Sequence, residues 1–152
     1  MSRAAVRQLI KTTLETSVTR LQSAGTADDP SRVAAHPVWD WEGLSPAAAV
    51  HHEASDTVEE ARALYSNLYD FSLWLYVLAD RNAPGVPPNI EALAETIMDE
   101  LFAQAVPALR QAGFEVLKSD GTPNNAPWRK FNGIRYRAER IPLRYEVANG
   151  DV

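Results

Sequence analysis

Hydrophobic and polar residues alternate in an informative way between positions 69 and 79. Neighbouring side chains on a strand point to opposite faces of the sheet, so residues two apart share a face. The odd positions are all apolar, whereas the even positions begin polar at Asp70 and Ser72 and become apolar from Trp74. A strand that is apolar on both faces for half its length is expected to be covered on both sides. The pattern therefore predicts the central strand of the core.

Two other segments have the three- and four-residue spacing of apolar side chains that is typical of helices. The first runs from Ser2, a suitable N-cap residue, to about Ser23. The second begins after Asn89 and stops at Gly113, with a kink or restart at Pro107 because proline has no amide proton. The apolar positions of these helices are Val6, Leu9, Ile10, Leu14, Val18 and Leu21, and Ile90, Leu93, Ala94, Ile97, Leu101 and Phe102.

Further extended segments complete a sheet. They are predicted at residues 47–53, 59–69, 114–118 and 134–147. Residues 59–64 also fit a short helix, so two interpretations stay open there. A long loop is predicted at about 26–46 and a flexible loop at about 119–133, where proline, glycine and asparagine are frequent. The sequence thus predicts one α+β domain over residues 1–152, with a mainly antiparallel β-sheet packed against an N-terminal helix and a second long helix.

The last strand changes the phase of its apolar positions. They are even up to Ala138 and odd from Ile141 onward. A β-bulge, one extra residue near Glu139, would restore a single apolar face. Pro142 cannot donate to a strand ladder, which predicts a bulged or edge-like strand. With the bulge, the outer face carries Arg135, Arg137, Pro142, Arg144 and Glu146.

Composition sets the broad class. The chain has 152 residues, 45% of them apolar, and a domain of this size buries roughly 70% of its unfolded surface. The absence of cysteine excludes a disulfide scaffold, thiolate metal sites and thiol catalysis. Arg3, Arg7, Lys11 and Glu15 interrupt any signal-peptide core, and no apolar run reaches membrane-spanning length. A cytoplasmic protein without a membrane partner is the default expectation.

Charge is unevenly distributed along the chain. The formal net charge of −5 argues against a dedicated nucleic-acid binder. Residues 53–100 contain ten acidic and two basic residues, whereas residues 101–152 contain five acidic and eight basic ones. Two interpretations fit this division: opposite faces that bind copies of the same chain, or two solvated faces that never meet.

The candidate chemistry is sparse. His51-His52-Glu53 resembles a metal cluster, but on a strand only His51 and Glu53 would share a face, and a catalytic zinc site normally needs three ligands. His36 is the one other histidine. The sequence has no nucleophile-elbow serine, phosphate-binding glycine loop or Walker lysine, which argues against an enzyme.

Two aromatic features suggest contacts with other molecules. Trp39 and Trp41 in the long loop could anchor a partner, because tryptophan is enriched at interface hot spots, or could fold back onto the loop's own core. Near the end of the chain, basic residues are interleaved with aromatic ones. The basic residues are Arg129, Lys130, Arg135, Arg137, Arg140 and Arg144. They suit either a nucleic-acid backbone or ion pairs at a protein interface, and the acidic overall charge favours the interface.

The order of elements resembles the tail terminator and tail-completion proteins of long-tailed bacteriophages, which share it with related neck proteins at the head–tail junction. The resemblance lies in the N-terminal helix from Ala5, the strand from Phe71, the helix over residues 90–111 and the closing segment Ile141-Pro-Leu-Arg-Tyr-Glu-Val. It covers most of the chain as a pattern of elements. The long loop with its two tryptophans, and Pro142, depart from that pattern.

The resemblance implies a structural virion-assembly protein without catalysis or cofactor. Such proteins form a ring, commonly a hexamer, that caps the tail tube and joins it to the neck and head. DNA would pass through the lumen without specific binding, because acidic walls repel it. The predicted location is the virion tail, with assembly in the host cytoplasm. Between subunits, the acidic face of Glu91, Glu95 and Asp99 would meet the basic face of Arg135, Arg137 and Arg144.

Two other classes of function also fit the sequence. The first is a small adaptor or regulatory module that acts as a monomer or dimer through its aromatic loop. The second is a nucleic-acid-binding protein that uses the C-terminal arginines.

Overall fold

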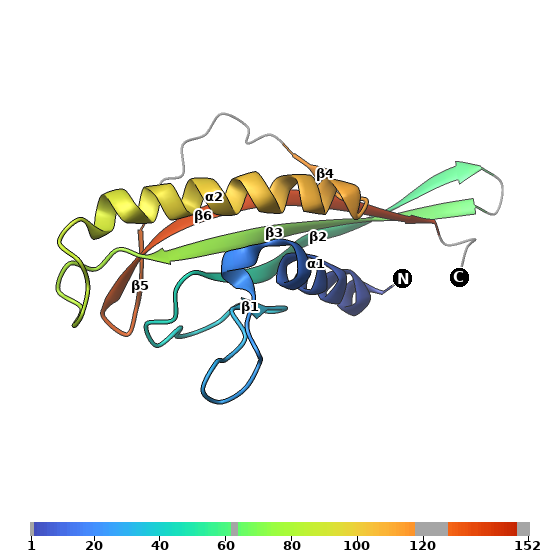
Figure 1. Ribbon diagram of the computed structural model, residues 1–152. Coiled ribbons are helices and arrows are strands. Elements are labelled where there is room, and N and C mark those ends of the chain that lie inside the picture. The colour runs from blue at the N-terminus through green and yellow to red at the C-terminus, as the bar shows by residue number, and fades with distance from the viewer. Residues whose placement is uncertain (1, 62–63, 118–127, 149–152) are drawn as a thin grey trace.

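The structure is a computed structural model that describes residues 2–61, 64–117 and 128–148, with only the backbone described for 54–61, 64–66 and 148. A six-stranded sheet carries two helices (Figure 1). The elements are α1 (Arg3–Ser17), a 3-10 turn η1 (Thr19–Leu21), β1 (Val33–Ala34), β2 (Ala47–Ala61), β3 (Leu64–Leu78), α2 (Ile90–Gln111), β4 (Glu115–Val116), β5 (Trp128–Phe131) and β6 (Ile134–Ala148).

The sheet is mainly antiparallel, which confirms the predicted α+β class. Its strand order is β1-β2-β3-β6-β4, and β5 also pairs with β6. Of the described pairs only β1–β2 is parallel. β3 lies in the middle, paired with β2 on one side and β6 on the other. The prediction of a central strand is confirmed.

β3 divides the molecule into two apolar clusters. The odd residues of β3, such as Leu73, belong to the larger cluster, and Tyr76 belongs to the smaller one on the opposite face. Both helices contribute to the larger cluster, so we call this side of the sheet the helix-covered face. Residues 34–44 cover part of the opposite side, which we call the loop-covered face.

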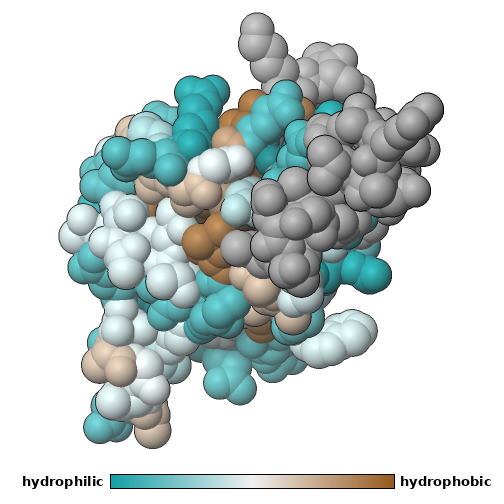
Figure 2. Space-filling model, turned by 90° about the vertical axis from the view of Figure 1, so that its right-hand side faces the viewer, coloured by the Kyte–Doolittle hydropathy of each residue, from teal (hydrophilic) through white to brown (hydrophobic). Residues whose placement is uncertain are grey.

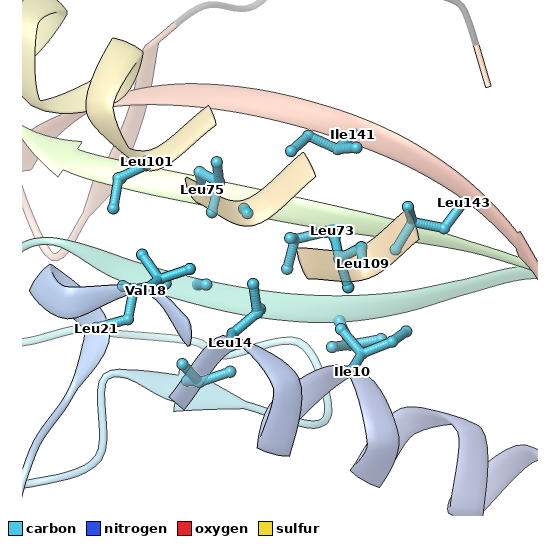
Figure 3. Close-up of a cluster of buried hydrophobic side chains, with 14 of the residues drawn as sticks. Ile10, Leu14, Val18, Leu21, Leu73, Leu75, Leu101, Leu109, Ile141 and Leu143 are labelled. Carbon is cyan, nitrogen blue, oxygen red and sulfur yellow. The ribbon is translucent and has the colours of Figure 1, made fainter. Parts of the chain in front are cut away.

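The core between the helices and the sheet is filled by aliphatic side chains, shown in Figure 3. Ile10 and Leu14 of α1, Leu101 of α2 and Leu73 of β3 are each completely buried. Each buried side chain of this size contributes about 1.5–3 kcal/mol. The two helices also contact each other, and Arg20 of η1 forms an ion pair with Glu100 of α2 at 2.5 Å. The helix layer therefore forms one packed unit.

The β2–β3 hairpin projects beyond the part of the sheet that the two helices cover. Both strands have 15 residues, and the hairpin extends past the ends of both helices (Figure 1). Among the described residues, pairing between β3 and β6 ends at Ser66, and beyond this point the described part of the hairpin has two paired strands. Figure 2 views the molecule from this end, where hydrophilic residues cover most of the described surface and a few hydrophobic ones show between them.

The N-terminal helix matches its prediction except at its end. The Ser2 hydroxyl accepts a hydrogen bond from the Ala5 amide, as an N-cap should. The regular helix stops at Ser17 instead of about residue 23, because Val18 adopts an extended conformation. The 3-10 turn that follows still buries Leu21.

The second helix is continuous from Ile90 to Gln111. It passes through Pro107, so the predicted restart is wrong. Gly113 ends it as predicted, with a positive φ of 101°. The Gly113 amide donates to the Arg110 carbonyl and the Phe114 amide to the Leu109 carbonyl, which is the Schellman pattern of a glycine-ended helix.

The buried side of α2 differs from the prediction at two positions. Leu93 is 37% exposed, whereas Met98, which was not among the predicted positions, is buried. Val6, Ile10 and Leu14 of α1 are buried as predicted.

The predicted bulge in β6 is absent. β3 and β6 pair without a register shift from Ser66↔Ala148 to Leu78↔Tyr136. The apolar phase changes because the strand serves both clusters: Tyr136 and Ala138 are buried on the loop-covered face, and Ile141 and Leu143 on the helix-covered face. Regular alternation without a bulge thus explains the sequence pattern, because β6 buries apolar side chains on one face at its start and on the other face further along.

Pro142 is accommodated inside a paired strand. Its carbonyl accepts a hydrogen bond from the Leu117 amide on the outer side of β6. In an antiparallel strand, the N–H and C=O of one residue point to the same side. The missing amide proton of Pro142 therefore faces away from β3 and leaves the β3–β6 ladder intact.

The loop predictions are partly correct. Residues 26–46 are mostly irregular, apart from the two residues of β1. The helical alternative for residues 59–64 is wrong, because residues 59–61 belong to β2 and Leu64 begins β3. The prediction of a flexible loop at 119–133 is wrong at its C-terminal end, because residues 128–131 form β5, which pairs with β6. Residues 118–127 lie outside the described residues.

The dependence of the fold on β3 can be measured with two leucine substitutions. Leu73→Ala is expected to lower the free energy of unfolding by about 2–5 kcal/mol, because Leu73 is completely buried. Leu93→Ala removes the same atoms from an exposed position and is expected to change it by at most about 0.5 kcal/mol. Urea denaturation followed by circular dichroism gives both values. Equal losses would contradict the assigned core.

Candidate interaction surface

The long loop is held in place from both sides of the sheet. On the α1 side, the Arg7 guanidinium donates to the Ala35 carbonyl at 2.7 Å and to the Val50 carbonyl at 3.1 Å. On the opposite side, the Tyr136 hydroxyl donates to the Leu44 carbonyl at 3.2 Å. Burial raises the pKa of Tyr136 to about 12, so this hydroxyl stays a donor over the physiological range. We call residues 35–46 the tryptophan loop.

The two tryptophans of this loop have opposite environments. Trp41 is 7% exposed and packs against Tyr76 with 6.2 Å between ring centroids. Trp39 is 96% exposed. Trp41 therefore covers the loop's own core, which was one of the two interpretations. Trp39 remains the candidate for a contact with another molecule.

A cavity of about 360 Å³ lies beside Trp39, and we call it the Trp39 cavity. Its wall contains aromatic and basic side chains and no carboxylate. The lining residues are Pro37, Val38, Trp39, His51, Tyr76, Arg129, Lys130 and Phe131. The His51 Nε2 atom is buried and has no hydrogen-bond partner among the described residues. Burial lowers the pKa of His51, so the imidazole is mostly neutral at pH 7.

Arg129 and Lys130 are the basic residues of this cavity. The Arg129 guanidinium lies 5.0 Å from the ring centroid of Trp74, a cation–π distance. Neither residue forms an ion pair within the part of the chain that the structure describes. The Trp39 cavity therefore carries positive charge that no described carboxylate neutralises.

The predicted interface arginines lie elsewhere and have partners within the chain. Arg135 stacks on Trp128 at 3.9 Å and lies 3.8 Å from Glu91 of α2. Arg137 forms an ion pair with Glu139 at 2.8 Å. By strand alternation, both arginines are on the helix-covered face.

Arg144 lies on the opposite face, where it pairs with Asp70 at 2.8 Å. This hydrogen bond raises the pKa of Arg144. The neighbouring Arg140 contacts Ser72 at 2.6 Å and Glu53 at 3.7 Å. The prediction of one outer face shared by Arg135, Arg137 and Arg144 is therefore wrong, because without the bulge residue 144 has the opposite orientation to residues 135 and 137.

The acidic residues of α2 fall into two groups. Glu91 contacts Arg81 at 2.6 Å as well as Arg135, so it is neutralised within the chain. Glu95 and Asp99 are exposed and form no ion pair with any described residue. They border a groove of about 390 Å³, which we call the α2 groove, lined by Glu95, Met98, Asp99, Phe102, Arg137 and Glu139.

The candidate metal residues do not form a site. His51 and Glu53 share the loop-covered face, but Glu53 accepts a hydrogen bond of 2.6 Å from Ser72. Within the described residues, no group of three or more histidine, aspartate or glutamate side chains could hold a metal ion. None of the described helices is long and apolar enough to cross a membrane.

Comparison of the sequence with known protein families and with curated proteins gives no match.

The different roles of the two tryptophans can be tested by alanine substitution. Trp41→Ala is expected to lower the free energy of unfolding by about 3–5 kcal/mol, because it removes a buried ring from the smaller cluster. Trp39→Ala should change it by no more than about 0.5 kcal/mol. Chemical denaturation of both variants measures the difference. A large loss from Trp39→Ala would show that its ring packs inside the domain.

Proposed function

We propose that the chain is a structural subunit of a long-tailed bacteriophage, a tail terminator or tail-completion protein that assembles into a ring. In this role it caps the tail tube and forms the interface that joins the tail to the neck. It performs no reaction, and its partners are copies of itself, the tail tube protein and the neck proteins. The location is the virion tail.

The observation that carries this proposal is the open edge of the long hairpin. Of the described strands, none pairs with the outer edge of β2 over residues 54–61, the last part of this strand. At about 3.4 Å per residue, this leaves a strand edge of about 27 Å. Unpaired strand edges are templates for pairing with another chain. A two-stranded ribbon beyond the core is also only marginally stable alone, and contact with a neighbour would stabilise it.

The charges favour a protein partner over a nucleic acid. Arg135, Arg137, Arg140 and Arg144 are all paired with carboxylates of the same chain. To bind phosphates, these arginines would have to give up their carboxylate partners. The loss of the ion pairs would offset the free energy gained from the phosphate contacts. The net charge of −5 adds general repulsion of DNA. The same repulsion suits a ring through which DNA passes without being retained.

The exposure of Trp39 also fits a small adaptor that binds one partner as a monomer. An adaptor and a ring subunit differ in their assembly and in their genetic context. Genes for tail tube and neck proteins should lie beside the gene for this chain if it is a tail protein. Their absence there would favour the adaptor.

Inactivation of the gene in the genome that encodes it tests the proposal directly. Electron microscopy is expected to show heads separated from tails, with tails of irregular length, because nothing ends tube growth or joins the head. Expression of the wild-type chain from a plasmid should restore complete particles and is the control. Complete, infectious particles without the protein would overturn the proposal.

A further inference from the structure

We infer that Trp39 and Arg129 of one copy bind the α2 groove of a second copy, and that this contact joins the subunits. The inference rests on the proposed ring and specifies which surfaces form it. It replaces the sequence-based pairing of α2 with Arg135, Arg137 and Arg144.

The first surface is an exposed aromatic side chain next to free positive charge. Trp39 is 96% exposed, and tryptophan is enriched among the residues that carry most of the binding energy of protein interfaces. It lies beside Arg129, whose guanidinium is held over Trp74 and has no carboxylate partner among the described residues. This combination of a tryptophan and an arginine is typical of interface hot spots.

The second surface has the complementary properties. Met98 and Phe102 give the α2 groove an apolar wall, and sulfur and aromatic groups are favourable neighbours for an indole ring. Three carboxylates and one guanidinium line the groove, and the guanidinium of Arg137 is occupied by Glu139. Glu95 and Asp99 are left to attract an incoming cation. The volume of about 390 Å³ is sufficient for one indole side chain.

The positions of the two surfaces determine the type of assembly. The tryptophan loop covers one face of the sheet, and α2 covers the other. A contact between them is heterologous, because each copy uses one surface to bind the next copy and the other to bind the previous one. Such contacts close into a ring when the rotation between subunits allows it.

A second copy suits these surfaces better than other occupants. In the part of the chain that the structure describes, Glu95 and Asp99 of the groove and Arg129 beside Trp39 form no ion pair, so one contact would neutralise both surfaces. A nucleic acid would need a track of free cations, whereas the neighbouring arginines of β6 already have carboxylate partners.

Charge reversal on each surface, followed by mixing, provides the test. Arg129→Glu alone and the double variant Glu95→Arg/Asp99→Arg alone are each expected to weaken self-association about 30-fold or more, as measured by analytical ultracentrifugation over a concentration series. An equimolar mixture should assemble again, because the new glutamate of one variant faces the new arginines of the other. Arg3→Glu has the same charge change as Arg129→Glu, at the start of α1, and should assemble like wild type.

Trp39→Ala should weaken association to a similar extent while preserving the free energy of unfolding. Circular dichroism of every variant establishes that the fold is intact. A wild-type protein that stays monomeric at all concentrations would overturn this contact, as would charge variants that assemble like wild type or fail to recover on mixing. Charge variants that still form rings would contradict only the contact, whereas complete particles without the gene would contradict the proposed function. Binding of DNA that is lost in Arg129→Glu would assign the surface to nucleic acid instead.

Discussion

The structure depends on the requirement that β3 be covered on both faces. Its odd residues pack under the two helices, and its even residues from Trp74 onward need a second cover. The tryptophan loop supplies this cover, with Trp41 in contact with Tyr76. Hydrophobic burial thus holds the tryptophan loop in place although the loop has no regular structure. Exposure of the smaller cluster would lose the free energy gained by burying several apolar side chains. Fixing Trp41 inside also holds Trp39 at the surface.

The two covers give the molecule two different outer surfaces. One is a helix whose Glu95 and Asp99 pair with no described cation, and the other is a loop beside Arg129 and Lys130, which pair with no described carboxylate. Several other charges are paired inside the chain, as in Arg144–Asp70 and Arg137–Glu139. Exposed pairs of this kind add little stability.

The elements were predictable wherever local pattern determines them. The alternation around Phe71 and the Ser2 cap depend on neighbours in sequence, and both predictions are confirmed. The predicted bulge near Glu139 is wrong because the prediction assumes a single apolar face. The pattern of β6 alone does not show that one end of this strand packs under a loop from a distant part of the chain. Ion pairs such as Glu91–Arg135 join residues far apart in the chain. The sequence alone therefore does not distinguish Arg129, which has no described carboxylate partner, from the arginines of β6, which have one.

The central claim is that the chain is a subunit that stands beside identical subunits. Electron cryomicroscopy of the assembled wild-type protein tests it most directly. The account predicts a closed ring in which the tryptophan loop of each copy lies against α2 of the next, with all hairpins pointing the same way. A ring in which Trp39 faces solvent, or a protein found only as a monomer both alone and on purified tail tubes, would contradict it.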